Sequence, residues 1–299
     1  IDSHIDVQYV ETKSHLIFLR RSRQIIRNIK PNTVISFEYF YNMCAVLICL
    51  GLNVKLLISE RNDPARVGSG FIKSRIRNIL YSFADVLICQ TDDAKNYFPD
   101  YIRKKVFIIL NPIMSGLPSK QEKVRDKVIV NFCRLNKQKN IPLLISAFEE
   151  FCNIHPDYEL HIYGDGAEKE TILDIIYSKH LERIIKVFPN TPNVHELVIN
   201  AAMFVSTSDF EGLSNSMLEA LSMGLPTICT DCPCGGARMV IEDGVNGFLI
   251  PVNNQKSLVD KMLLIAGSSE LTIKLSNNAL KINNKLNVDN ICKQWISLL

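Results

Sequence analysis

Residues 209–226 (DFEGLSNSMLEALSMGLP) combine residue types that can bind an anionic ligand. Gly212 lets a loop pass close to a bound molecule, and Ser214 or Asn215 can cap a helix that begins there. The free backbone N–H groups at a helix start point toward a negative group such as a pyrophosphate. The segment therefore predicts an anion-binding loop that leads into a helix.

Two carboxylates flank this predicted helix start. Glu211 precedes the helix and Glu219 lies in its second turn, so the two can address different parts of one ligand. A carboxylate such as Glu219 can accept hydrogen bonds from the 2′- and 3′-hydroxyls of a ribose. The spacing alone fits a capped amphipathic helix with incidental acids equally well.

A second group of candidate residues follows an apolar run in residues 131–140 (NFCRLNKQKN). In an open α/β sheet, ligands bind beyond the carboxyl ends of the strands. There Arg134 could hold a phosphate with its forked guanidinium, and Lys139 could supply a second charge. Lys137 competes with Lys139 for this role, and a solvated basic turn is the alternative for the whole segment.

Glycines form a third element, Gly164-Asp165-Gly166, after another apolar run. A backbone without side chains there can approach a base or a ribose. A tight turn is the simpler explanation, because two glycines at this spacing are common in turns.

Elements of an α/β fold position these residues. Short runs rich in β-branched residues alternate with amphipathic patterns, which indicates parallel βαβ units. The first predicted strands are residues 33–37, 54–59, 86–90 and 106–110, with helices at 16–29 and 71–83 among them. A second series of strands is predicted at 127–133, 160–163, 184–188, 203–206, 227–230 and 247–250. The polar stretch 114–127 between the two series predicts a linker, and hence two domains.

Composition limits the class of protein. The chain has 299 residues, 47% of them hydrophobic, which suits a globular protein with two ordinary domains. The longest apolar stretch, residues 43–52, predicts a buried helix, because a bilayer span needs about 18 such residues. The nine cysteines lack the spacing of a zinc site, so we expect reduced thiols and a cytosolic protein.

Basic residues are concentrated in the first part of the chain. Residues 1–112 hold 16 Lys and Arg against 10 Asp and Glu, although the whole chain has a net charge of only +3. Arg20, Arg21, Arg23 and Arg27 lie on one predicted helix, where they could face an anionic membrane. An ordinary solvated helix face is the alternative.

Taken in order, the three elements resemble the signature of the group 1 glycosyltransferases, also called family 4. The matching residues are Cys133-Arg134-Leu135 with Lys139-Asn140, Gly164-Asp165-Gly166, and the run from Glu211 to Pro226. Residues 235–238, 243–247, 251 and 288–295 continue the likeness. Residues 58–64 and 111–112 resemble bacterial members that build surface polysaccharides.

The resemblance implies an α/β GT-B fold, in which two Rossmann-like domains place parallel sheets across a cleft from each other. Residues 1–112 would form the acceptor-side domain, residues 113–285 the nucleotide-sugar-binding domain, and residues 286–299 a closing helix that packs back on the first domain. The family's first strand and Gly-rich loop have no counterpart here, so we expect the first domain to be incomplete.

The resemblance also implies a function. It predicts a glycosyltransferase that moves a sugar with retention from a nucleotide sugar, a UDP-sugar, to a glycan or lipid-linked saccharide during surface polysaccharide synthesis. Glu211 would be the catalytic residue that faces the transferred sugar. The donor-binding residues would be Arg134, Lys139, Gly212, Leu213 and Ser214 at the diphosphate, Glu219 at the ribose, and Gly164 and Asn190 near the nucleoside. Glu60 and Arg61 would lie on the acceptor side.

One residue departs from the family pattern. Cys133 replaces the glycine that precedes the arginine, which predicts a less open phosphate loop.

We expect neither a cofactor nor a metal. No D-x-D pair occupies a place suited to Mg²⁺, and Asp63, Asp92 and Asp93 are the carboxylates left as candidates. The expected partners are the donor, a glycan or lipid-linked acceptor and an anionic membrane surface, but no nucleic acid. The expected location is the cytoplasm, on the inner face of the cell membrane.

Three alternatives differ in class. An inactive, truncated nucleotide-sugar-binding module would bind the donor without transfer. A nucleotide-sugar 2-epimerase would share the GT-B fold, but the group 1 order of motifs argues against it. A pyridoxal-phosphate-dependent phosphorylase would also share the fold, but it needs a cofactor-bearing lysine that we cannot place in the sequence. A dinucleotide-dependent dehydrogenase would require G-x-G-x-x-G after an early strand, which the sequence lacks.

Overall fold

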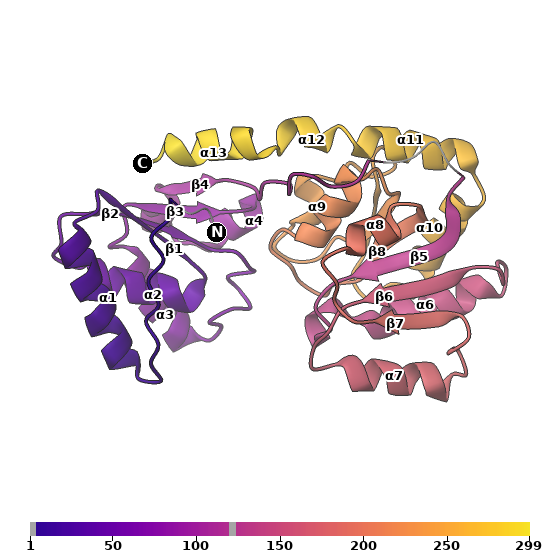
Figure 1. The fold of residues 1–299 in the computed structure, drawn as a ribbon, viewed down its shortest axis with the longest axis horizontal. Coiled ribbons are helices and arrows are strands. Elements are labelled where there is room, and N and C mark those ends of the chain that lie inside the picture. The colour runs from indigo at the N-terminus through magenta and orange to yellow at the C-terminus, as the bar shows by residue number, and fades with distance from the viewer. Residues whose placement is uncertain (1–3, 120–123) are drawn as a thin grey trace. The chain divides into compact units, whose positions relative to one another are not determined.

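The computed structural model describes residues 4–119 and 124–299. The chain forms two compact units (Figure 1). Unit 1 consists of Ile1–Ile109 with Trp295–Leu299, and unit 2 consists of Leu110–Gln294. Part of the expected linker, residues 120–123, lies outside the described residues.

Unit 1 is built on a parallel four-stranded sheet in the order β1-β2-β3-β4. Its strands are β1 (Thr33–Phe37), β2 (Lys55–Ser59), β3 (Val86–Cys89) and β4 (Val106–Ile108). Its helices are α1 (His15–Ile29), α2 (Tyr39–Cys49), α3 (Phe71–Tyr81), α4 (Asp92–Tyr97) and α5 (Asp100–Arg103). The apolar stretch at residues 43–52 falls largely in α2, which buries Cys44, Val46 and Ile48. The prediction of a buried helix there is confirmed.

Unit 2 is built on a parallel six-stranded sheet in the order β10-β9-β8-β5-β6-β7. Its strands are β5 (Asp126–Phe132), β6 (Glu159–Tyr163), β7 (Ile185–Phe188), β8 (Ala201–Ser206), β9 (Thr227–Thr230) and β10 (Phe248–Ile250). Its helices are η1 (Lys137–Lys139), α6 (Ile141–Cys152), α7 (Lys169–Ser178), α8 (Val194–Val198), α9 (Asn215–Ser222), η2 (Ala237–Met239), α10 (Gln255–Ala266), α11 (Ser269–Ala279) and α12 (Ile282–Lys285). Each predicted strand therefore occurs, with ends shifted by at most two residues.

The core of unit 2 explains its layers. Ile129, Leu160 and Val205 on the strands are fully buried, as are Leu144 and Phe148 on α6. Helices α6 and α7 lie along one side of the sheet (Figure 1). All six residues of the central strand β8 are buried without alternation, which is typical of parallel sheets.

The strand order of unit 2 contains a switch point. The chain runs from β5 to β6 and β7 on one side, and then returns to place β8 on the other side of β5. Connections leave β5 and β8 in opposite directions at this point, which opens a crevice beyond their carboxyl ends. The loops that follow β5 and β8 therefore border this crevice.

The last helix, α13 (Val288–Ile296), ends in residues that group with unit 1. In unit 1 the Trp295 ring lies 5.6 Å from the Phe37 ring, centroid to centroid. The ammonium of Lys55 donates a hydrogen bond to the carbonyl oxygen of Leu299 at 3.2 Å. These contacts tie the end of the chain to β1 and β2.

In the part of the chain that the structure describes, every helix is too short or too polar to span a bilayer.

Candidate functional site

The loop after β5 carries the predicted cations. It turns through η1 and ends at Asn140, whose positive φ of 46° starts α6 and whose side chain accepts a hydrogen bond from the N–H of Leu143. Arg134 is exposed, and within the described residues its side chain makes no hydrogen bond or ion pair. Lys139 lies deeper, with a side chain only 14% exposed. Lys137, the rival for its role, is exposed on the outside of the turn.

The loop after β8 is held against this turn by three side chains. The Gln138 side chain donates to the Phe210 carbonyl at 2.7 Å, and that of Asn140 donates to Asp209 Oδ1 at 2.8 Å. Thr207 Oγ1 donates to the carbonyls of Lys139 and Asn140, both at 3.0 Å. The structure therefore brings together the two segments that the sequence singled out.

Lys139 and Glu211 meet at the centre of this contact. The Lys139 Nζ donates a hydrogen bond to Glu211 Oε1, and the Ser208 hydroxyl donates to the same oxygen at 3.2 Å. The Glu211 side chain is 17% exposed. A predicted phosphate-binding cation and the predicted sugar-facing carboxylate are thus direct neighbours. Sequence separation gave no sign of this pair.

The start of α9 retains the features of an anion site. Ser214 is its N-cap residue, but the hydroxyl pairs with that of Ser216 at 3.0 Å and caps no backbone group of the helix. Nothing from the cap residue therefore occupies the N–H groups of the first turn. These groups carry the positive end of the helix dipole and can bind a ligand oxygen.

Close packing shapes the loop of Gly212 and Leu213. A Cβ added to Gly236 would lie 1.6 Å from the carbonyl oxygen of Gly212. Only glycine at position 236 lets the two backbones touch. Leu213 is buried at 5% exposure, so its side chain anchors the loop.

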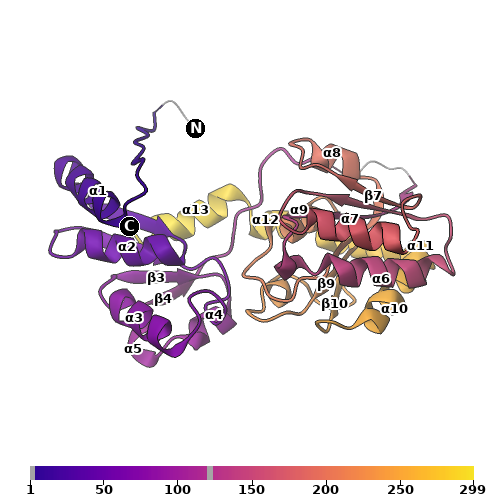
Figure 2. The same cartoon turned by 90° about the horizontal axis from the view of Figure 1, so that it is seen from below.

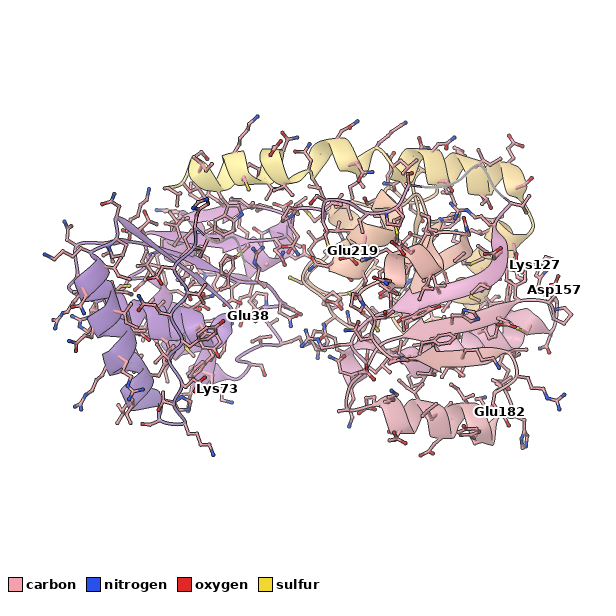
Figure 3. All side chains as sticks on the ribbon, in the orientation of Figure 1. Glu38, Lys73, Lys127, Asp157, Glu182 and Glu219 are labelled. Carbon is pink, nitrogen blue, oxygen red and sulfur yellow. The ribbon has the colours of Figure 1, made fainter. Side chains whose placement is uncertain are left out.

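Glu219 has a partner that the sequence analysis missed. The Nε2 of His195, on α8, lies 3.0 Å from Oε2 of Glu219, and the two side chains are 12% and 21% exposed. Figure 3 shows Glu219 on α9. His195 lies 24 residues from Glu219 in a helix of its own, and no spacing rule connects the two positions.

The glycines after β6 pack closely against the backbone of another loop. A Cβ at Gly164 would lie 1.9 Å from the carbonyl oxygen of Cys133, and one at Gly166 would lie 2.1 Å from that of Leu135. The glycines are therefore required by the approach of this loop to the cation-bearing loop. Asn190 is exposed, and its N–H donates to Asp165 Oδ2 at 2.8 Å. This bond links the loops after β6 and β7.

Cys133 lies inside the loop that follows β5. Its thiol donates to Asn131 Oδ1 at 3.0 Å, and Asn131 in turn donates to the carbonyl of Val205 on β8 at 2.7 Å. Burial raises the pKa of Cys133 to about 12. The thiol is therefore neutral at physiological pH and acts as a small packing residue.

The acceptor-side candidates lie in unit 1. Glu60 follows β2 and is only 2% exposed; Tyr81 donates its hydroxyl to this carboxyl group. Burial raises the pKa of Glu60 above its ordinary value. The Arg61 guanidinium lies 5.0 Å from the Phe37 ring centre and 5.7 Å from that of Trp295. Glu60 is therefore part of the hydrogen-bonded interior of unit 1, whereas the Arg61 side chain lies beside the rings of Phe37 and Trp295.

The carboxylates considered for a metal are separated by the fold. Asp63 is buried and accepts a hydrogen bond from the N–H of Ala65, while Asp92 and Asp93 occupy the first turn of α4. Among the described residues, no group of three or more His, Cys, Asp or Glu side chains could hold a metal ion.

The opposite edge of the unit 2 sheet, at the amino-terminal ends of β5 and β6, carries a different set of charges from the carboxyl edge. There Lys127 and Asp157 form a surface ion pair, which Figure 3 shows at the edge of unit 2.

Two parallel α/β sheets, one with cations and carboxylates gathered beyond its carboxyl ends, define a protein of the GT-B type with two Rossmann-like domains.

Comparison with protein families identifies the class further. The family model of "Glycosyl transferases group 1" matches residues 117–282, more than half of the chain. The chain therefore belongs to the group 1 glycosyltransferases and is a transferase enzyme by family.

Individual relatives are distant. The chain is 26% identical to a Campylobacter jejuni N-acetylgalactosamine-N,N'-diacetylbacillosaminyl-diphospho-undecaprenol 4-alpha-N-acetylgalactosaminyltransferase over 273 residues, which cover 86% of this chain and 73% of the relative. Staphylococcus aureus TarM, solved with UDP and alpha-GlcNAc-glycerol, has a TM-score of 0.80 at 21% identity. Anabaena HepE with UDP has a TM-score of 0.84 at 18% identity, covering 93% of this chain and 80% of HepE. The match with TarM covers 94% of this chain but only 58% of TarM.

Proposed function

We propose that this protein transfers a sugar with retention from a UDP-sugar to a glycan or lipid-linked saccharide in the synthesis of a surface polysaccharide. The observation that carries the proposal is the Lys139–Glu211 ion pair between the loops that follow β5 and β8, because the first of these loops also carries Arg134 and the second leads into α9. Two cations and a helix dipole at one crevice suit a diphosphate, and carboxylates beside them suit sugar hydroxyls.

The compared proteins support the donor and acceptor classes. TarM and HepE were both solved with UDP. The C. jejuni relative is named for a diphospho-undecaprenol-linked acceptor. The same name specifies that the relative forms an alpha linkage. In common UDP-sugars the bond from the sugar to the diphosphate is also alpha. An alpha product from an alpha donor is retention.

In this mechanism the chain positions the reactants and stabilises the departing diphosphate. Arg134 and the α9 start bind the diphosphate, Glu219 holds the ribose, and Glu211 faces the transferred sugar. Lys139 lies between the phosphate and the sugar, because it pairs with Glu211. One preorganised donor to an oxyanion contributes on the order of 3 kcal/mol in other enzymes, so these groups together can replace a metal ion.

Helix α3 is our candidate for the surface that meets the acceptor's membrane, because its burial pattern is inverted. Its inward side buries Arg77 and Tyr81, both 0% exposed, whereas Ile72, Ile76 and Ile79 are 72%, 50% and 59% exposed. At 100° per residue these isoleucines, with Phe83 beyond the helix end, form one stripe opposite Arg77. An apolar stripe turned outward fits an apolar environment.

Charge favours a membrane as that environment. Lys73 and Arg75 flank the stripe, and α3 contains no acidic residue. On α1, Arg20 and Arg27 are exposed, whereas the Arg23 guanidinium donates to the carbonyl of Ile48 and faces α2. Cations beside an apolar stripe are typical of helices that lie in an anionic membrane surface. We therefore propose peripheral binding to the cytoplasmic face through α3 (Figure 2), with Arg20 and Arg27 adding charge.

Liposome co-sedimentation tests the membrane surface. We expect binding to anionic but not neutral vesicles, weakening with salt, and loss of binding when Ile72, Ile76 and Ile79 are all changed to serine. Ile154→Ser, at a 60% exposed isoleucine of unit 2, is the matched control and should bind like the wild type. Equal recovery with neutral and anionic vesicles, or full binding by the triple variant, would refute this surface.

A turnover assay tests the enzymatic function. The protein is incubated with a panel of UDP-, GDP- and ADP-sugars and a lipid-linked saccharide, with and without EDTA. We expect release of UDP with formation of an alpha-linked product, at a rate that EDTA leaves unchanged. Tight binding of UDP without product from any acceptor would favour the binding-module alternative, and a loss of rate with EDTA would contradict metal independence.

A further inference from the structure

Glu219 is held by the protein on one side only. Its Oε2 lies 3.0 Å from His195 Nε2. Within the described residues, no protein group donates a hydrogen bond to its other oxygen, Oε1. The side chain is 21% exposed, so it is reached by solvent and by ligands but is not a free surface group.

His195 is itself well fixed. Its side chain is 12% exposed, and its ring meets the Phe132 ring edge-on, with centroids 5.9 Å apart and an interplanar angle of 85°. Phe132 is the last residue of β5 and is buried. The imidazole is therefore oriented by the sheet, and it transfers that orientation to a carboxylate on α9.

The hydrogen bond requires a proton on Nε2. Glu219 is acceptor-only when ionised, and both the protonated imidazole and the neutral form with hydrogen on Nε2 can donate to it. Oε1 and the second lone pair of Oε2 remain to accept hydrogen bonds from a ligand. A glutamate fixed in this way loses less side-chain freedom when a ligand binds, which favours affinity.

We propose that His195 is a positioning residue that holds the carboxylate of Glu219 in the orientation that accepts hydrogen bonds from the two ribose hydroxyls of the donor. The inference rests on the proposed role of Glu219. It assigns to His195 no contact with the reacting sugar, so its effect belongs to donor binding.

The experiment compares two ligands that differ only at the ribose. Calorimetric titration measures the affinity of UDP and of 2′,3′-dideoxyuridine diphosphate for the wild type, His195→Ala, Glu219→Gln and the double variant. We expect His195→Ala to weaken UDP binding about five- to tenfold, the size of one well-placed hydrogen bond. It should leave dideoxy-UDP binding nearly unchanged, and it should add nothing in the Glu219→Gln background.

Two further variants separate positioning from a merely structural role. His195→Gln keeps an N–H donor on a side chain of similar reach and should restore most of the UDP affinity. His161 forms a matched pair in unit 2, with Nε2 2.7 Å from Glu159 Oε2. His161→Ala should therefore leave UDP affinity unchanged. In turnover, His195→Ala should raise the KM for the donor more than it lowers kcat.

The outcomes separate the inference from the function on which it rests. If Glu219→Gln weakens UDP and dideoxy-UDP equally, the ribose role of Glu219 is wrong. If Glu219→Gln is selective for UDP but His195→Ala is not, or if His195→Gln fails to rescue a folded variant, His195 does not position Glu219. Thermal melting of each variant shows whether it is folded.

Discussion

Lys139 and Glu211 form an ion pair between the loops that follow β5 and β8, from positions 72 residues apart. The two side chains are only 14% and 17% exposed. Removal of one partner leaves the other as a poorly solvated charge, so each residue contributes to stability as well as to ligand binding. Arg134, five residues before Lys139 on the same loop, has no such partner among the described residues.

This difference predicts distinct effects of the two cations. Arg134→Ala should weaken UDP binding, with a loss of ~1.5–3 kcal/mol for a charge-assisted contact, and should leave the free energy of unfolding unchanged. Lys139→Ala should weaken UDP binding and also lower the free energy of unfolding, by about 1–3 kcal/mol. Calorimetry with UDP and urea unfolding measure the two quantities. Adding Glu211→Gln should recover part of the stability that Lys139→Ala loses. Equal unfolding curves for both single variants would show that the ion pair contributes nothing.

The two carboxylates should separate kinetically. Glu219→Gln should raise the donor KM, because a neutral amide accepts the ribose hydrogen bonds less strongly. Glu211→Gln should lower kcat more than it raises KM, because Glu211 faces the reacting sugar. Initial rates over a range of donor concentrations measure both constants. Identical losses confined to KM in the two variants would contradict these roles.

Gly236 should tolerate no side chain. A Cβ there would lie 1.6 Å from the Gly212 carbonyl oxygen, so Gly236→Ala must displace the loop that leads into α9. We expect a loss of ~1–3 kcal/mol in the free energy of unfolding, together with weaker UDP binding. Gly267→Ala is the control, because a Cβ there would lie 3.1 Å from the carbonyl oxygen of Leu263 and needs only a slight shift, which should cost much less than the displacement at Gly236. Denaturant unfolding compares the two. Wild-type stability of Gly236→Ala would mean that the loop can move away without cost.

The cysteines should differ sharply in reactivity. Burial raises the pKa of Cys133 and Cys232 to about 12, and of Cys152 to about 11. A pKa of 12 leaves roughly one thiolate in ten thousand at pH 8, and the thiolate is the form that reacts. Cys292 is exposed, so iodoacetamide should label it first, as peptide mass spectrometry would show. In urea all nine cysteines should react. Rapid labelling of Cys133 in the native protein would show that its loop opens.

Glu60 should make unit 1 less stable as pH rises. Burial raises its pKa, so the folded state holds a proton that the unfolded state releases. The stability from this group is fully present below the unfolded pKa, about 4.5, and is lost as the pH rises through the higher folded pKa. Glu60→Gln removes this loss and should raise the urea midpoint, relative to the wild type, more at pH 8 than at pH 4.5. Glu182→Gln, at an exposed position, should show no such difference. A pH-independent difference for Glu60→Gln would mean that Glu60 stays ionised.

The sequence was sufficient to predict the strands, the two α/β series and the loops that carry Arg134, Lys139 and Glu211. These follow from local signals, namely apolar periodicity and polar residues directly after a strand. Pairings between loops could not be predicted, because the Lys139–Glu211 and His195–Glu219 contacts depend on strand order. Gly164 illustrates the limit well. Its type suggested access to a ligand, which stays a prediction, and the structure adds a packing reason that the sequence did not reveal, because the backbone of Cys133 lies against it.

Helix α3 shows a second limit. Its isoleucines gave the period expected of a helix that faces a core, yet the structure places Arg77 inside and the isoleucines outside. The guanidinium of Arg77 donates to the carbonyl of Pro64 at 2.7 Å and lies 4.8 Å from the Tyr97 ring centre, so the interior supplies its partners. Hydrophobic periodicity identifies the helix but not the side that faces inward.

The double pairing of β5 has a consequence for the order of folding. Val128 aligns with Glu159 on β6, whereas Ile129 aligns with Met203 on β8, so the second pairing closes a much longer loop. Loop-closure entropy makes it costlier by about 0.8 kcal/mol, and during synthesis β8 leaves the ribosome later than β6. Strands β5, β6 and β7 can therefore pair with one another before β8 has been synthesised. The crevice at β5 and β8 is therefore assembled after the β5-β6-β7 part of the sheet's carboxyl edge, so a nascent chain gains its anion-binding loops only after half of its framework is in place.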